Sequence, residues 1–81
     1  MPTIHRGAGW KIQIFANDHR PPHVHVVSAE HAIQIAIADG YVLHGRRRAI
    51  RALSDARRWV DENRDWLQRE WNRIAERASD D

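Results

Sequence analysis

The sequence contains no cysteine, which excludes disulfide bonds and every thiolate metal site. It has no apolar run that approaches the roughly 20 residues of a membrane-spanning helix. It also lacks a charged leader followed by an apolar stretch and a cleavage site. We therefore expect neither a membrane protein nor a secreted one, and a cytoplasmic location is the simplest interpretation.

The 81 residues suffice for one domain, because separate hydrophobic cores need roughly 100 residues or more apiece. Apolar residues make up 42% of the sequence and charged residues 30%, a balance typical of a globular domain rather than a disordered chain. The net charge of +2 hides an uneven distribution: residues 46–58 carry six arginines against one acid, and residues 59–81 carry four arginines against seven acids. All six histidines lie in the first 44 residues. The chain thus has a histidine-bearing front half, a basic junction and an acidic tail.

The front half predicts an antiparallel sheet. Apolar and polar residues alternate, as in half-buried strands, within residues 10–15, 23–27 and 33–37. Asp39 and Gly40 form a two-residue hairpin signal that returns the chain along residues 41–44. Residues 2–5 can add an edge strand. The connections are too short for parallel crossovers, so a meander of four or five strands is expected over residues 1–45.

The back half, residues 46–78, predicts one long helix that can bend near Asn63. No glycine or proline interrupts it, and at 100° per residue its apolar side chains fall in a stripe roughly 60° wide. Such a helix spans on the order of 45 Å, against about 20 Å for a strand, so part of it should overhang the sheet. The predicted fold is therefore α+β, and the overhang predicts self-association or a protein partner. Trp59, Trp66 and Trp71 are expected to anchor the core, with Trp66 at the stripe edge as the candidate for a partner contact.

The most unusual segment is Asp18-His19-Arg20-Pro21-Pro22-His23-Val24-His25. Residues two apart on a strand point the same way, so His23 and His25 should project side by side, with His19 folding back before the prolines. Together with Asp18, the three imidazoles are candidates to bind zinc or another divalent metal with one position open for water.

Two other interpretations of this segment stay open. The same imidazoles can serve metal-free acid–base catalysis, for example in RNA cleavage, because imidazole titrates near neutral pH. They can also be solvated side chains on a wet strand face, with Asp18 merely capping the turn. The other histidines, His5, His31 and His44, have no motif around them and are expected to be ordinary surface or edge residues.

The arginines Arg46, Arg47 and Arg48 lie where the predicted helix begins. Cations at the positive end of a helix dipole are unfavourable by roughly 0.3–1 kcal/mol each, so stability alone does not explain them. They predict an anion- or partner-binding surface, which Arg51 and Arg58 extend and which fits nucleic-acid phosphates or an acidic protein. A solvated charge run is the alternative. No aromatic stacking platform accompanies the arginines, so sequence-specific recognition is not predicted.

The sequence resembles the bacterial family DUF4160, a domain of unknown function. The resemblance rests on Met1-Pro2-Thr3-Ile4, on the segment from Asn17 to Val26, on the Ile/Ala strand, on Leu43-x-Gly45 and on the spaced Trp59, Leu67 and Trp71. It covers nearly the whole chain. Its members are typically encoded beside a second small domain, so the resemblance implies a toxin-like role and a cognate antitoxin.

The chain departs from the family pattern at two places. Arg46, Arg47 and Arg48 stand where a Leu-Pro step is expected after Gly45, and Asn63 stands where a histidine is expected between the tryptophans. If that histidine takes part in chemistry, this protein lacks it.

These observations give one leading hypothesis and two rivals. The leading hypothesis is a toxin-like component that binds an acidic antitoxin, and nucleic acid as a further ligand, through its arginines, with the histidines and Asp18 as any active or metal site. The rivals are a non-catalytic DNA- or partner-binding module and a small metal-dependent hydrolase.

Overall fold

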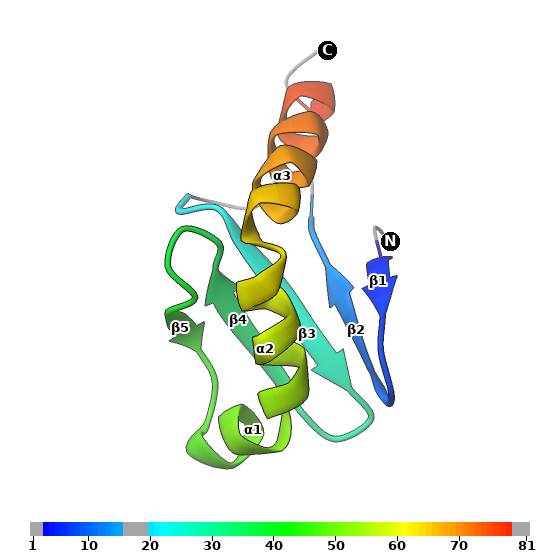
Figure 1. The fold of residues 1–81 in the computed structure, drawn as a ribbon, viewed down its shortest axis with the longest axis vertical. Helices are drawn as coiled ribbons and strands as arrows, with labels where there is room; N and C mark the ends of the chain where they lie inside the picture. Colours follow the sequence, from blue (N-terminus) through cyan, green and yellow to red (C-terminus); the bar gives the residue numbers. More distant parts are fainter. Residues whose placement is uncertain (1–2, 16–19, 79–81) are drawn as a thin grey trace.

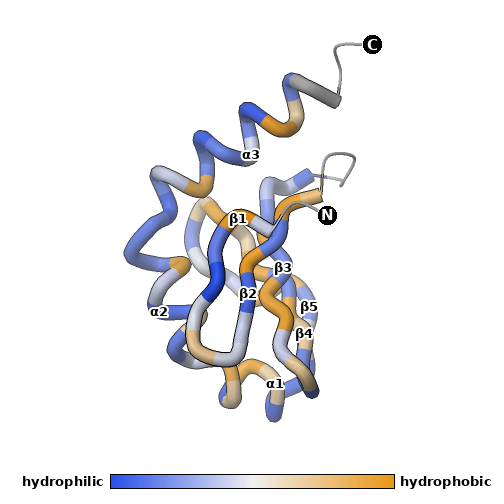
Figure 2. Tube along the Cα trace, turned by 90° about the vertical axis from the view of Figure 1, so that its right-hand side faces the viewer, coloured by the Kyte–Doolittle hydropathy of each residue, from blue (hydrophilic) through white to orange (hydrophobic). Residues whose placement is uncertain are grey.

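The computed structural model describes residues 3–15 and 20–78, which form a five-stranded antiparallel sheet followed by helices (Figure 1). The elements follow one another in the order β1 (Thr3–Arg6), β2 (Trp10–Gln13), β3 (His23–Ser28), β4 (Ala32–Ala36), β5 (Val42–His44), α1 (Arg47–Ala52), α2 (Ser54–Glu62) and α3 (Arg64–Ala78). Viewed from the side of β1, the helices lie on one side of the sheet (Figure 2). The predicted α+β class and antiparallel meander are confirmed. Among the described residues, no helix combines the length and the apolar character needed to cross a membrane.

The sheet is a plain meander, with strands in the order β1-β2-β3-β4-β5 and every neighbouring pair antiparallel. Cross-strand partners share a face, so Ile12, Val26 and Ile33 form one row on the apolar face. All three side chains are at most 1% exposed and belong to the core that the helices cover. The period-two alternation of the sequence is therefore the pattern that decides which face is buried.

The hairpin between β4 and β5 is wider than the predicted two-residue turn. The Ala36 N–H donates to the Tyr41 carbonyl oxygen at 2.8 Å, so residues 37–40 form the loop. Gly40 has φ +77°, and a Cβ there would lie 2.3 Å from Oδ1 of Asp61 on α2. The Asp-Gly signal thus marks the correct place, because the loop needs a residue that tolerates positive φ and close packing.

The helical region is divided at two places, whereas the sequence predicts one long helix that can bend near Asn63. The chain leaves helical geometry at Leu53 (φ −102°, ψ 28°) and at Asn63 (φ −125°, ψ 23°). Asn63 is the expected bend: its side-chain amide donates to the Trp59 carbonyl oxygen at 2.8 Å, which satisfies a carbonyl at the end of α2. The break at Leu53 lets α1 lie across the end of the sheet while Ala49 and Leu53 both stay buried (Figure 1).

Helix α3 packs on the core with only part of its length. Its first turns pack through Leu67, which is fully buried, and Trp71, which is 6% exposed. The remainder of α3 extends past the end of the sheet (Figure 1). The overhang expected from comparing helix and strand lengths is therefore present.

Candidate functional site

The histidines of β3 lie side by side, as the strand spacing predicts. The ring centroids of His23 and His25 are 5.2 Å apart. The His25 ring meets Phe15 edge-on at 4.7 Å, and the His23 ring lies 5.4 Å from Trp71. The pair is thus held between Phe15, which follows β2, and an aromatic side chain of α3.

The His23 ring has a defined orientation. The Arg20–Pro21 peptide bond is cis, and Nδ1 of His23 lies 2.8 Å from the Pro21 carbonyl oxygen. A carbonyl oxygen can only accept, so Nδ1 donates and the neutral ring keeps its proton there. Nε2 is then the nitrogen with the lone pair, the atom that binds a metal or takes a proton. His23 is only 7% exposed, which restricts access to that atom from solvent.

The other two members of the predicted site, Asp18 and His19, lie outside the described residues. Within the described part of the chain, no group of three histidine, cysteine, aspartate or glutamate side chains is placed to hold a metal ion. A zinc site formed with His19 therefore stays a prediction, with His23 and His25 supplying two of the imidazole ligands that zinc prefers.

Metal content tests this prediction directly. If His19, His23 and His25 bind zinc, protein purified without chelator should carry close to one equivalent, and the double substitution His23→Ala, His25→Ala should leave less than about a tenth. Elemental analysis by mass spectrometry makes the measurement, with His31→Ala as a matched control that should retain the metal. Wild-type protein with less than about a tenth of an equivalent would rule the zinc site out.

A row of polar side chains runs from the histidine pair across the sheet, on the face opposite the core. The register pairs Gln13 with His25, His25 with Gln34, and Gln34 with His44. Neighbouring strands are about 4.8 Å apart, so His25 and His44 are separated by roughly 10 Å. The histidine pair and the basic junction are therefore separate places on the molecule, joined by Gln34.

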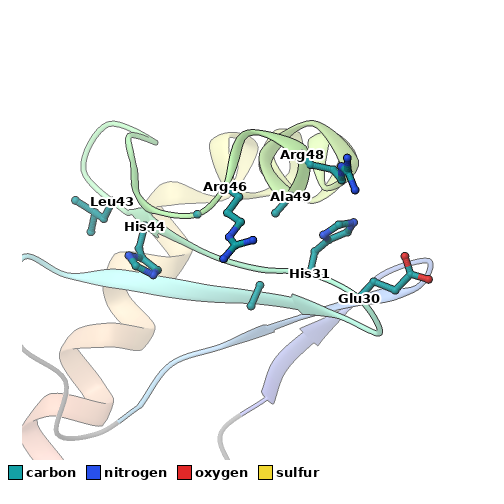
Figure 3. Close-up of a pocket in the computed structure, with 9 residues that line it drawn as sticks. Glu30, His31, Leu43, His44, Arg46, Arg48 and Ala49 are labelled. Carbon is teal, nitrogen blue, oxygen red and sulfur yellow. The ribbon is translucent and has the colours of Figure 1, made fainter.

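The basic junction lines a cavity of about 1080 Å³ beside the ends of β4 and β5. Its walls carry the cationic or ionisable side chains of His31, His44, Arg46 and Arg48, with Glu30 as the one acid among the lining residues. Figure 3 shows the Arg46 guanidinium descending between the rings of His44 and His31, with Arg48 above the His31 ring. The arrangement is a concave cationic site suited to carboxylate or phosphate groups.

The cavity exists because β5 leaves β4 early. Pairing between the two strands ends at Gln34 and His44, and the chain turns away at Gly45. Gly45 has φ +153°, and a Cβ there would lie 2.6 Å from Cγ2 of Ile33. Only glycine fits this combination of backbone angle and close approach, and the turn directs Arg46 back over the sheet.

The one acid that lines the cavity, Glu30, forms no ion pair with its arginines. Among the described residues, no carboxylate forms an ion pair with Arg46 or Arg48. The first turn of α1 contains no acid, and Arg46 at its N-cap makes no side-chain capping hydrogen bond. Because α1 spans only Arg47–Ala52, the charge of the site comes from side chains, and the dipole of a long helix does not contribute as the sequence implied.

The predicted basic surface is only partly assembled in the cavity. Arg46 and Arg48 line it, whereas Arg47 and Arg51 on α1 and Arg58 on α2 are exposed outside it. His31 and His44, which the sequence places as ordinary surface or edge residues, line it instead. The hairpin signal at residues 39–40 was the available clue, because folding the chain there brings residues 44–48 opposite residues 31–35.

Three of the four tryptophans, Trp10, Trp59 and Trp66, form a cluster at the β1 side of the sheet. The His5 ring stacks flat on Trp59 at 3.9 Å and lies 5.7 Å from Trp10. Trp66, the predicted partner contact, packs edge-on against Trp59 at 6.1 Å and remains half-buried. This packing explains the anchoring role expected of Trp59 and Trp66; the partner contact stays a prediction.

The family described as Domain of unknown function (DUF4160) matches residues 9–72. No curated protein and no solved structure matches the chain. The matched range contains the histidine pair, the polar row and every residue that lines the cavity.

Proposed function

This chain belongs to the DUF4160 family, whose function is unknown, and on that premise we propose that it is the toxin-like component of a bacterial toxin–antitoxin module. In this proposal the cavity of His31, His44, Arg46 and Arg48 binds an acidic antitoxin. The toxin-like role comes from the family resemblance. The acidic character of the partner comes from the cavity.

One observation carries the binding part of the proposal: two guanidinium groups lie in a concave site, and no described carboxylate, including that of Glu30 in the wall, forms an ion pair with them. Like charges repel each other, so two guanidinium groups that line one site favour the binding of an anion. A concave surface of one charge also raises the rate at which an oppositely charged partner associates. An acidic protein is therefore the counterpart that this surface favours.

The histidine pair supplies the chemistry in this proposal. With its proton on Nδ1, the neutral His23 ring can accept a proton at Nε2, and His25 at 5.2 Å is near enough to act on the same substrate group as the acid. Cleavage of RNA by the neighbouring hydroxyl needs such a base and acid. A non-catalytic binding module is the second candidate, and the 7% exposure of His23 favours it, because a base needs contact with its substrate.

Expression in a bacterial host separates these candidates. Production of the protein without its genetic neighbour is expected to arrest growth, and co-production of the neighbour should restore growth and yield a complex that co-purifies. The substitutions His23→Ala and His25→Ala together should abolish the arrest while leaving the complex intact. Arrest that persists in this double variant would remove the histidines from the mechanism and leave the binding module.

Removing the positive charge of the cavity tests whether the cavity binds the partner. Arg46→Gln with Arg48→Gln is expected to weaken the complex about tenfold at low salt, because two exposed charge contacts contribute roughly 0.2–1 kcal/mol each. Calorimetric titration at several salt concentrations measures the change. Arg6→Gln with Arg69→Gln removes the same charge from exposed positions outside the cavity and should alter affinity less than about threefold. Equal losses of affinity in both double variants would mean that the overall charge of the protein, and not the cavity, governs binding.

A further inference from the structure

We propose that the cavity receives its partner as a β-strand: an extended acidic segment adds to the edge of β4 at Ala32, where β5 has left the sheet. The proposal rests on the proposed function for the acidic character of the partner, and adds the way in which that partner binds. It draws on the register, on the direction of the main-chain hydrogen bonds and on the charges around the gap.

The register leaves part of β4 without a neighbour on one side. β3 pairs with β4 along its length, from His23–Ala36 to Val27–Ala32. β5 pairs with β4 only through Gln34 and Ile35. Gly45 still approaches Ile33 closely, so the open edge is short and lies at Ala32, beside the cavity that Ala32 lines.

The main chain of Ala32 points into this gap. In an antiparallel strand, successive residues direct their N–H and C=O groups to opposite sides. The Ser28 N–H donates to the His31 carbonyl oxygen at 2.8 Å and the Ile37 N–H donates to the Pro22 carbonyl oxygen at 3.0 Å, so odd-numbered residues of β4 face β3. Ala36 bonds to Tyr41 on the other side. Ala32 is an even-numbered residue, so its N–H and C=O groups must face the side that β5 has left.

No described main chain pairs with Ala32 across the gap. Continued pairing would place residue 46 opposite Ala32, yet no main-chain hydrogen bond joins the two. The Arg46 carbonyl oxygen instead accepts from Ile50 in α1 at 2.9 Å. An incoming strand would therefore find both a donor and an acceptor on Ala32, as in other cases of strand addition to a sheet edge.

The side chains around the gap select an acidic strand. Alternate residues of an added strand lie on the same face about 7 Å apart, a spacing that lets two carboxylates reach Arg46 and Arg48 or the rings of His31 and His44. Leu43, which is 39% exposed at the rim, offers an apolar contact. A nucleic-acid backbone has phosphates but no amide groups to pair with Ala32, so a protein segment fits better.

The probe for this mode is a short synthetic peptide that alternates glutamate with threonine, compared with the same peptide N-methylated at alternate residues. Both carry the same charge, but the second lacks the amide donors needed for a ladder. We expect the first to bind at least about tenfold more tightly in a calorimetric titration with the full chain. It should also slow hydrogen exchange of the Ala32 amide by at least about tenfold.

Substitutions at Ala32 provide a second test of strand addition. Proline is tolerated at the first residue of a strand and removes the N–H, so Ala32→Pro should weaken peptide binding about tenfold while Ala32→Thr retains it. Binding of inorganic sulfate, which needs only the cations, should be the same in both variants. If Ala32→Pro does not fold, the peptide comparison and amide exchange on the wild-type protein still decide.

The outcomes distinguish this inference from the proposed function. Equal affinity for the two peptides, with loss on Arg46→Gln and Arg48→Gln, would overturn strand addition and leave the acidic partner in place. Peptide affinity that is unchanged by Arg46→Gln and Arg48→Gln would overturn the two proposals together. A single-stranded oligonucleotide that displaces the peptide and binds more tightly, or a dimer of the chain that blocks it, would likewise contradict the assignment.

Discussion

Replacing Trp71 by alanine is expected to lower the free energy of unfolding by about 3–5 kcal/mol. Trp71 is 6% exposed, lies on α3 and reaches both the core and the ring of His23. Its removal leaves a cavity where α3 meets the ring of His23. A domain of this length has a total stability of roughly 4–12 kcal/mol, so the variant should be close to unfolded at 37 °C. Urea denaturation followed by circular dichroism measures the loss.

Trp71→Phe is the matched control, because it keeps an aromatic ring and should cost less than about 2 kcal/mol. If the contact with His23 matters, nuclear magnetic resonance signals of the His23 ring should move in Trp71→Ala and stay nearly in place in Trp71→Phe. A loss below about 1 kcal/mol in Trp71→Ala would show that α3 does not depend on this contact.

Replacing Gly45 by alanine has the next largest expected effect, about 2–4 kcal/mol of unfolding free energy. The new Cβ would lie 2.6 Å from Ile33 Cγ2, and φ of +153° is strained for any residue with a side chain. Relief of the clash must shift the chain where it turns toward Arg46. We therefore expect the variant to lose stability and, unlike a purely structural change, to weaken binding of an acidic partner about tenfold.

Gly9→Ala is the control for this prediction. Gly9 also has positive φ, at +82°, but no atom lies within 4 Å of the position that its Cβ would take. The variant should show backbone strain of about 1 kcal/mol, with partner affinity unchanged. If Gly45→Ala and Gly9→Ala behave alike in both measurements, the close approach to Ile33 has no part in shaping the cavity.

The sequence predicts the sheet and the adjacent histidines because both follow from period-two alternation. His23 and His25 must share a face on any strand, and the structure places their rings 5.2 Å apart. The break at Leu53 has no such signal: leucine favours helices, and the apolar stripe continues through it. Tertiary packing of α1 across the sheet end decides that break.

The cavity could be predicted only in part. A hairpin folded tightly at residues 39–40 would place residue 35 opposite His44. The structure instead has a four-residue loop, which alone would place His44 opposite Ile33, and a register shift beside Leu43, which then pairs His44 with Gln34. A shift of one residue moves a side chain to the other face of the sheet, so this irregularity decides that His44 shares the face of Gln34 and His25. No local pattern of residue types marks it in advance.

The two outer strands of the sheet differ, and the difference bears on assembly. β1 is four residues long and its register is interrupted between Thr3 and His5, which makes it a poor template for further pairing. The gap beside Ala32 is open at the opposite side. If an added strand can extend the sheet on one side alone, the molecule accepts a single segment and cannot assemble into filaments. Complexes formed at this gap should therefore have one-to-one stoichiometry.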